Sequence, residues 1–219
     1  MSGSYHVVGV DLSGPTNVRD TVFLAFEVLG TGIRLSQAIQ GAKDHDIHAA
    51  AEELLSLGEV VVGLDAPLSY NPNGGDRPGN KTLREKVIRT GLHPGSVMTP
   101  TMTQIAYLTT LRGTAIARIL SSFPEPKPEI VEVHPGAAMA LRGAPIADLR
   151  AYKMDPAAQQ RLLGWLKGQG FVIKDIHKTL DSHHVDACAA ALAAWKWHQG
   201  DEVWVEPASL PHHPFDYAC

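Results

Sequence analysis

Two short apolar segments of this chain, residues 5–10 and 59–64, are each followed directly by an aspartate. In the second segment Val60, Val61 and Val62 are consecutive and do not alternate with polar residues, which is typical of a strand covered on both faces. The sequence therefore predicts an α/β protein in which Asp11 and Asp65 lie at the ends of buried strands.

Hydrophobic periodicity and turn formers predict the other elements. Residues 21–29 follow a two-residue period, and a Gly-Thr-Gly turn leads to another short segment at 33–35, so three antiparallel strands open the chain. A strand is also expected at 130–134 and a shorter one at 171–173, while the tail, 206–219, is expected to be irregular. Helices are expected at 47–57, with Asp46 as the N-cap, and at 81–89, 104–120, 156–168 and 182–198.

The composition is that of an ordinary globular protein. The 219 residues are 44% hydrophobic and 19% charged, enough for one sizeable core, so we expect a single domain over residues 1–219. No apolar run approaches the roughly 20 residues of a membrane span, and the first residues lack the pattern of a signal peptide. With two cysteines, a disulfide framework is excluded, and we expect a cytoplasmic protein with reduced thiols.

Residues 66–103 form a long stretch rich in proline and glycine, a length that is usually functional or disordered. It carries five basic residues against two acidic ones, a net +3 that leaves the rest of the chain at −7. The overall charge of −4 argues against a surface that coats nucleic acid, so phosphate contacts would be local. We expect Arg77, Lys81 and Arg84 to bind phosphates, with a merely solvated loop as the alternative.

Four acidic residues stand at informative places: Asp11, Asp65, Glu132 within the expected strand 130–134, and Asp186 early in the last helix. Side chains at the carboxyl ends of neighbouring strands converge on one crevice. Carboxylates that share a crevice raise one another's pKa or require a cation. Because oxygen-only ligation suits hard ions, the four acids predict a site for Mg²⁺ or Mn²⁺.

Each of these acids also has a structural interpretation. Asp11 and Asp65 are each followed by turn formers and would serve as strand-ending turns. Glu132 would form an ion pair with a residue such as Arg142, and Asp186 would interact with the helix dipole.

The sequence does not predict a zinc site at His184 and Cys188. His184 and Cys188 are four residues apart on one helix, but no further ligands accompany them, so a surface histidine and a packed cysteine are expected. His212 and His213 lie in the tail and are expected to be solvated.

The order of elements and a set of short motifs resemble the ribonuclease-H-like fold, in particular an uncharacterised family of predicted nucleases with that fold. The resemblance runs from the first strand through the last helix. It implies a mixed five-stranded sheet, three antiparallel strands followed by parallel ones, flanked by helices, with residues 66–103 inserted after the fourth strand. The motifs are residues 8–14 (VGVDLSG), 63–68 (GLDAPL), 77–78 (RP), 83–84 (LR), 94–100 (PGSVMTP), 132–135 (EVHP), 152–153 (YK) and 184–187 (HVDA).

The resemblance also implies roles for individual residues. Asp11 is similar to the first-strand aspartate that contacts both metals, Asp65 to the fourth-strand acid and Asp186 to the last-helix aspartate. Glu132 would be a further ligand or lie behind the ligands, and His183 stands where related resolvases place an acid or a histidine. Whether one metal binds or two is open at this point.

These roles predict a metal-dependent nuclease that hydrolyses phosphodiester bonds of DNA, RNA or a nucleotide. His183, or His134 beside Glu132, would orient the attacking water or relay its proton. One alternative is nucleotide-dependent phosphotransfer of the actin-like and sugar-kinase class, in which Ser13 would contact phosphates, although such proteins pair two of these folds. Another is a nucleic-acid-binding module without catalysis.

Overall fold

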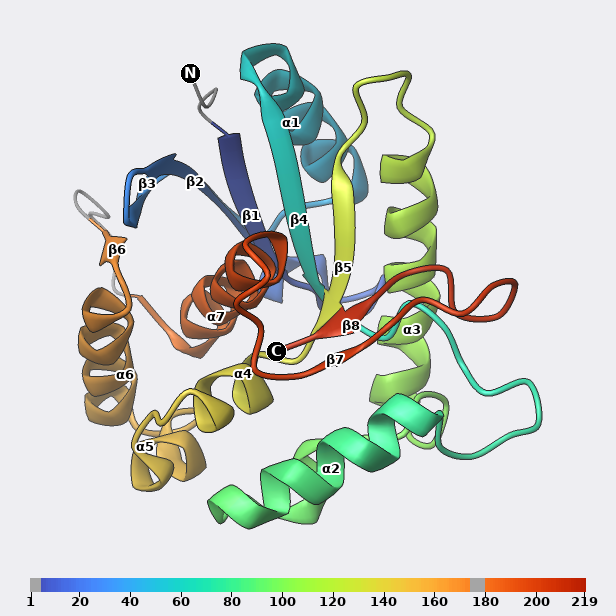
Figure 1. The fold of residues 1–219 in the computed structure, drawn as a ribbon, viewed down its shortest axis with the longest axis vertical. Coiled ribbons are helices and arrows are strands. Elements are labelled where there is room, and N and C mark those ends of the chain that lie inside the picture. Colours follow the sequence, from blue (N-terminus) through green and yellow to red (C-terminus); the bar gives the residue numbers. More distant parts are fainter. Residues whose placement is uncertain (1–4, 174–179) are drawn as a thin grey trace.

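In the described residues, 5–173 and 180–219 of this computed structural model, eight strands form one mixed sheet with helices on both faces (Figure 1). The strands are β1 (Tyr5–Asp11), β2 (Val22–Leu29), β3 (Gly32–Gln40), β4 (Glu59–Asp65), β5 (Glu129–Val133), β6 (Phe171–Val172), β7 (Val205–Glu206) and β8 (Tyr217–Ala218). The α-helices are α1 (Asp44–Leu57), α2 (Pro78–Thr90), α3 (Gln104–Ser121), α4 (Pro135–Leu141), α5 (Ile146–Ala151), α6 (Pro156–Gly168) and α7 (Ser182–His198), and the 3₁₀ turns are η1 (Val18–Asp20) and η2 (Pro94–Ser96).

The sheet order is β6-β3-β2-β1-β4-β5-β8-β7. Strands β1, β2 and β3 pair antiparallel, and β4 and β5 follow parallel to β1, so the predicted sequence of three antiparallel strands and then parallel ones is confirmed. The predicted number of five strands is wrong. Two-residue strands extend both edges. Strand β6 is the short strand expected at 171–173, whereas β7 and β8 come from the tail that we expected to be irregular, because segments so short leave no periodicity to read.

Two sets of buried apolar side chains lie on opposite faces of the sheet. Alternate residues of β1 divide between them, Val7 on one face and Val8 on the other. One set packs against α1 and α3, and the other packs chiefly against α7, α4 and α6. The sheet is therefore covered on both faces, as the consecutive valines of β4 predicted.

Helix α7 lies directly on β1 and β4 because both strands carry a glycine at the contact. A Cβ atom added to Gly9 would lie 1.9 Å from the carbonyl oxygen of Ala187, and one on Gly63 would lie 2.6 Å from that of Ala190. The alanines of α7 keep its backbone close to the strands. This contact positions the first turns of α7 beside the ends of β1 and β4.

Some helix boundaries differ from the prediction. Helix α1 begins at Asp44 and not after Asp46; the carboxylate of Asp46 instead accepts a hydrogen bond, 2.9 Å long, from the backbone N–H of the N-cap residue Lys43. Helices α4 and α5 were not predicted, since seven and six residues are too few for a helical period to stand out.

The insertion, residues 66–103, contains α2 and η2, and α2 lies beyond the end of the sheet at which β4 and β5 finish (Figure 1). Arg84 holds its loops together: the guanidinium pairs with Asp76 and donates a 2.9 Å hydrogen bond to the carbonyl oxygen of Val97. Within the described part of the chain, no helix combines the length and the apolar character needed to cross a lipid bilayer.

Candidate active site

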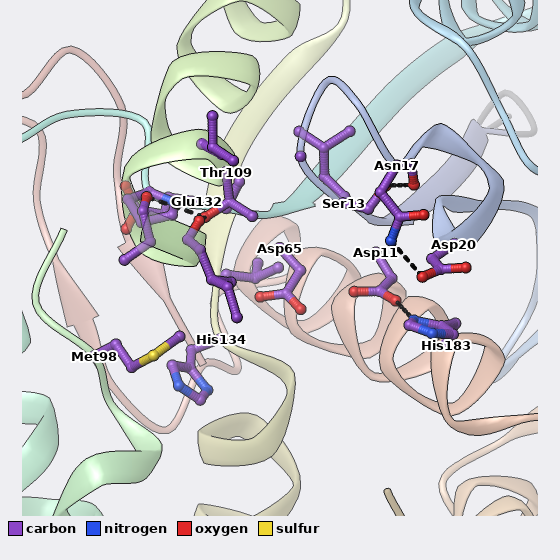
Figure 2. Close-up of a pocket in the computed structure, with 18 of the residues that line it drawn as sticks. Asp11, Ser13, Asn17, Asp20, Asp65, Met98, Thr109, Glu132, His134 and His183 are labelled. Atoms are coloured by element: carbon purple, nitrogen blue, oxygen red, sulfur yellow. Dashed lines mark hydrogen bonds and ion pairs between the residues drawn. The ribbon is translucent and has the colours of Figure 1, made fainter. Parts of the chain in front are cut away.

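Asp11 and Asp65 lie side by side at one edge of the sheet. They are register partners at the carboxyl ends of the parallel strands β1 and β4. Both side chains line a cavity of about 440 Å³ that is bounded by the Ser13 loop, the start of α3, the insertion and the first turn of α7 (Figure 2). The strand ends predicted to meet in one crevice therefore do so.

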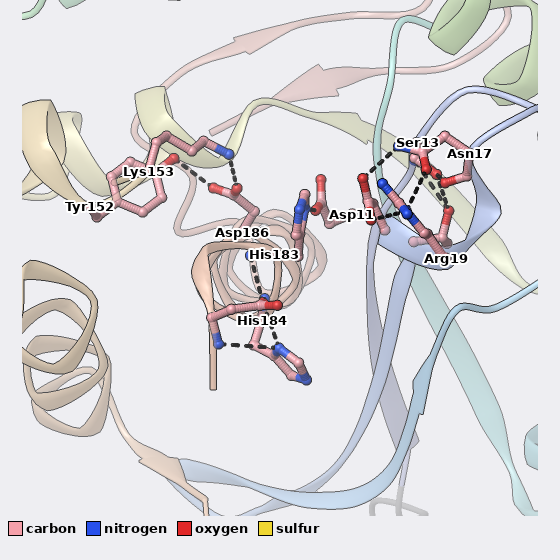
Figure 3. Close-up of polar contacts among 12 residues, drawn as sticks. Asp11, Ser13, Asn17, Arg19, Tyr152, Lys153, His183, His184 and Asp186 are labelled. Carbon is pink, nitrogen blue, oxygen red and sulfur yellow. Dashed lines mark hydrogen bonds and ion pairs between the residues drawn. The ribbon is translucent and has the colours of Figure 1, made fainter. Parts of the chain in front are cut away.

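Asp186, on α7, lies near enough to Asp11 and Asp65 for the charges to interact. Lys153 and Tyr152 hold its carboxylate (Figure 3). The hydroxyl of Tyr152 donates a 2.7 Å hydrogen bond to Oδ1, and the ammonium group of Lys153 pairs with Oδ2. Asp186 is 2% exposed, so its charge is balanced chiefly by these neighbours. Lys153 also lines the cavity, so the cluster contains one cation of its own.

The cluster raises the pKa values of its buried acids. Burial raises the pKa of Asp65 well above its usual range, and the negative charges of Asp11 and Asp186 raise it further. Burial also raises the pKa of Asp186, to about 6, although Lys153 counteracts the increase. Ionising all three carboxylates is therefore unfavourable unless a proton or a cation compensates their charge.

His183, one turn before Asp186, faces Asp11. Its Nδ1 atom lies 2.7 Å from Asp11 Oδ2, and the imidazole is partly exposed at the cavity. The hydrogen bond to Asp11 raises the pKa of His183, although partial burial opposes this increase. A partly exposed imidazole that is held in one orientation at the cavity is suited to proton transfer.

Glu132 forms a buried ion pair with Arg77. Both terminal nitrogens of the guanidinium group donate to the carboxylate, with Nη1 2.8 Å from Oε2, and the backbone N–H of Leu68 donates to the same oxygen at 2.8 Å. Arg77 also donates to Ser69 and to Asn80 and is 5% exposed. The ion-pair alternative for Glu132 thus describes this geometry, with Arg77 as the partner in place of Arg142.

This ion pair affects the roles predicted for Glu132 as a metal ligand and for Arg77 as a phosphate contact. The carboxylate of Glu132 faces the cavity but is already satisfied by three donors. Arg77 is engaged by Glu132 beneath the surface, so the predicted phosphate clamp does not have an exposed guanidinium here. Together they connect β5 to the start of α2 and fix the insertion against the sheet.

The other predicted substrate contacts have structural partners or lie elsewhere. Arg84 pairs with Asp76, lowering the pKa of that acid to about 2, and does not line the cavity. Lys81 lines a shallower hollow beside His212. His134 lines the cavity, but it caps α4 by accepting from Ala137, and its Nε2 lies 2.7 Å from the carbonyl oxygen of Ser96.

Ser13 lines the cavity on a loop fixed by a buried arginine. Its hydroxyl donates to the carbonyl oxygen of Asn17 at 2.6 Å. Arg112, 1% exposed, donates to the carbonyl oxygen of Ser13 at 3.0 Å and to Thr21 Oγ1 at 2.6 Å, and its Nε contacts Asp44. The backbone that follows Asp11 is thus held rigidly at the cavity rim.

Two histidines differ from the expectation. His184 is 4% exposed and not at the surface, because it forms a capping box with Asp181 at the start of α7. His213 is not simply solvated: its Nδ1 lies 2.7 Å from the hydroxyl of Ser69. Cys188 is buried, as predicted.

The donors of the cluster fit a hard divalent ion in their chemistry, since Asp11, Asp65 and Asp186 offer carboxylate oxygens from three elements. Their carboxylate oxygens do not all lie within 4.8 Å of one another. Within residues 5–173 and 180–219, the one set of three such ligand atoms lying within 4.8 Å of one another is Glu59, Glu129 and His198, at the other end of β4 and β5. A cation would thus share Asp186 with Lys153.

A comparison with protein families matches residues 9–211 to the family described as Protein of unknown function (DUF429). The chain belongs to this family. No curated protein and no solved structure matches the chain. The region matched to DUF429 contains Asp11, Asp65, His183 and Asp186, so the whole cluster lies within the family's domain.

Sequence reasoning about this DUF429 chain missed Lys153 and Tyr152 as members of the site, although the pair is part of the motif set. The two residues directly follow α5, a helix too short to show a helical period in the sequence. Arg112 was missed because it lies inside an amphipathic helix, where an arginine is usually exposed. The requirement for charge balance among three acids was a signal that some lysine or arginine must lie nearby.

Proposed function

We propose that this DUF429 protein has a ribonuclease-H-like core and hydrolyses phosphodiester bonds of nucleic acid with the help of Mg²⁺ or Mn²⁺. The observation that carries the proposal is the pairing of Asp11 and Asp65 at adjacent parallel strand ends, with Asp186 of α7 close enough to raise the pKa of Asp65. The order β3-β2-β1-β4-β5 supports the core assignment, because it combines three antiparallel and two parallel strands as the resemblance implies.

Asp11 and Asp65, which line the cavity, would hold the ion, and Asp186, whose carboxylate Tyr152 and Lys153 engage, would be shared between the ion and Lys153. A bound divalent cation supplies an activated water and stabilises the charge that develops on the leaving oxygen. Glu132 is not part of the proposed ligand set, since Arg77 and Leu68 already satisfy its carboxylate.

The chain's own residues provide orientation and proton transfer. Asp11 accepts from His183 Nδ1, which leaves Nε2 as the atom that takes up a proton from the attacking water. Lys153 balances the charge of Asp186 at the cavity. Arg112 keeps the Ser13 loop in place at the rim, which orders the backbone that the substrate meets.

The first experiment measures metal binding. Isothermal titration of the chain with Mn²⁺ should show binding that Asp11→Asn and Asp65→Asn each weaken by at least about tenfold, because each removes a charged ligand. Glu52→Gln, an exposed acid on α1, is the matched control and should bind Mn²⁺ as the wild type does. Unchanged affinity in Asp11→Asn would overturn the proposed ligand set.

The second experiment measures cleavage. End-labelled single-stranded, duplex and branched DNA and single-stranded RNA are incubated with wild type, Asp11→Asn and Glu52→Gln in Mn²⁺, Mg²⁺ or a chelator. The proposal predicts metal-dependent products with the wild type and the control, and none with Asp11→Asn. The proposal is refuted if the wild type cleaves none of these substrates in either metal.

A further inference from the structure

The cavity that contains Asp11 and Asp65 also has an apolar wall. Met98, Ile105 and Leu108 line it, from the loop after η2 and the first turns of α3. In Figure 2, Met98 lies beyond Asp65 on the side away from Asp11 and His183. The cavity therefore combines charged groups with apolar side chains.

The side chains of this apolar wall are not all buried in the core of the protein. Met98 is 48% exposed, Ile105 is 69% exposed and Leu108 is partly buried, and all three side chains line the cavity. Exposed apolar side chains that gather at a cavity with a few polar groups are typical of a ligand site. A ligand that covers these side chains needs an apolar surface, and it also needs a second group that binds at the carboxylate cluster.

The charges around the cavity indicate which phosphodiesters fit. Among the described residues that line it, both basic side chains are already paired, Arg77 with Glu132 and Lys153 with Asp186. Of the other basic residues of the insertion that were expected to bind phosphate, Arg84 is paired with Asp76, and Lys81 faces a different hollow. A duplex is bound mainly through many Lys and Arg contacts to its phosphates, which this rim does not supply.

The size of the cavity agrees with a small group. Its volume of about 440 Å³ lies toward the lower end of the range of roughly 300–1,000 Å³ that is usual for sites of single small ligands. That volume accommodates one nucleotide.

We propose that the substrate is a phosphodiester with an unpaired nucleobase, in a single strand or at a strand end, whose base packs against Met98, Ile105 and Leu108 while its phosphate lies at Asp11 and Asp65. This inference rests on the proposed phosphodiester hydrolysis. Every nucleobase has an apolar face that can pack against side chains, so the site would select unpaired nucleotides without distinguishing one base from another.

Binding is tested with a single-stranded oligodeoxynucleotide that carries one 2-aminopurine, in Ca²⁺. The fluorescence of this base is quenched by its neighbours in the strand and should rise when the base leaves them for the apolar wall. Ile105→Ser and Met98→Thr should each weaken binding about tenfold, because each removes apolar surface that the base would cover. Both side chains are exposed, so the variants are expected to fold.

The chain offers matched controls for both substitutions. Leu111 is 53% exposed on the same helix as Ile105, and Met102 is 77% exposed in the same loop as Met98, and neither lines the cavity. Leu111→Ser and Met102→Thr should bind the strand within about twofold of the wild type. The same oligonucleotide annealed to its complement should bind more weakly than the single strand. Equal binding by Ile105→Ser and Leu111→Ser, or tighter binding of the duplex, would overturn the base site.

Turnover separates the two proposals. In Mn²⁺ the wild type should cleave a base-bearing strand with a higher kcat/KM than an abasic strand of equal length, and Ile105→Ser should reduce that preference. Cleavage of both strands at equal rates, unaffected by Ile105→Ser, would overturn the base site and leave the proposed hydrolysis intact. Failure of the wild type to cleave either strand would overturn both.

Discussion

The imidazole of His183 reaches across to the end of β1, with its Nδ1 atom 2.7 Å from Oδ2 of Asp11. The two residues are 172 positions apart, and the contact connects the first turn of α7 to the sheet edge at which the acids meet. Because the hydrogen bond to Asp11 raises the pKa of His183, this contact is also sensitive to pH.

We predict that His183→Gln loses stability mainly at low pH. The raised pKa means that the folded protein holds the proton more tightly than the unfolded chain. The stabilisation is complete below the unfolded pKa of about 6.5 and is lost as the pH rises through the folded pKa. His183 is partly exposed, so solvent reduces the effect to about 1 kcal/mol.

Thermal unfolding of His183→Gln from pH 5.5 to 9 tests this prediction. The Tm difference from the wild type should be largest near pH 5.5 and smallest near pH 9. His212→Gln, an exposed histidine of the tail, should show no such trend. A deficit that is constant across the range would mean that the charge of His183 does not stabilise the fold.

We predict that Asp65→Asn stabilises the metal-free protein at neutral pH. Burial, together with the charges of Asp11 and Asp186, raises the pKa of Asp65, so its ionisation destabilises the fold as the pH rises above the unfolded value of about 3.9. Replacing the carboxylate by an amide removes this repulsion. The Tm in a chelator should rise by roughly 2–4 °C per kcal/mol gained at pH 7.5, and the gain should shrink toward pH 4.

The same variant provides a test with metal. Mn²⁺ should raise the Tm of the wild type, because binding stabilises the folded state, and should raise that of Asp65→Asn much less. A lower Tm for Asp65→Asn in the chelator would show that the charge of Asp65 is compensated within the apoprotein.

The positions of Asp11 and Asp65 could be predicted because each ends an apolar segment, and local sequence indicates where a strand stops. The partners of the acids could not. Arg77 and Glu132 are 55 positions apart, and whether a basic residue meets a phosphate or a buried carboxylate depends on how the insertion packs. Periodicity carries no information on that packing.

The C-terminal edge strands of the sheet also could not be predicted from local sequence. Strands β7 and β8 have two residues each, and their hydrogen bonds to the sheet arise from tertiary contacts between the C-terminal tail and β5. In contrast, the alanines of α7 and the glycines of β1 and β4 are a local signal of a close contact between helix and sheet, since small side chains are what such a contact requires.

We predict that Gly9→Ala is strongly destabilising. Its Cβ would lie 1.9 Å from a carbonyl oxygen and 2.5 Å from a backbone nitrogen of α7, and backbone atoms cannot move aside cheaply. Displacing α7 should cost about 3 kcal/mol or more. Urea unfolding measures the loss. Gly164→Ala is the control, since nothing lies within 4 Å of the added carbon in α6, and it should be stabilising by about 0.5–1 kcal/mol.

Replacing Arg112 should loosen the rim of the cavity. Arg112→Met removes hydrogen bonds to the carbonyl oxygens of Ser13 and Ala42 and to Thr21, and leaves buried acceptors unsatisfied. We expect a loss of about 3 kcal/mol in urea unfolding and faster amide hydrogen exchange around Ser13. Arg118→Met, at an exposed position of the same helix, should change stability by less than about 0.5 kcal/mol. Equal effects of the two substitutions would refute the structural role of Arg112.

The last prediction concerns the cation that the cluster already contains. Lys153 lowers the pKa of Asp186, which burial raises to about 6, so Lys153→Met should raise that pKa further. A carbon-13 NMR titration of the metal-free protein should show the Asp186 carboxyl titrating at higher pH in the variant than in the wild type. The variant's loss of stability should be greater at pH 8 than at pH 5, because at pH 5 a proton replaces the missing ammonium. Lys81→Met, whose side chain faces another hollow, should leave the titration unchanged; a shift equal to that of Lys153→Met would show that the effect is a general one of net charge.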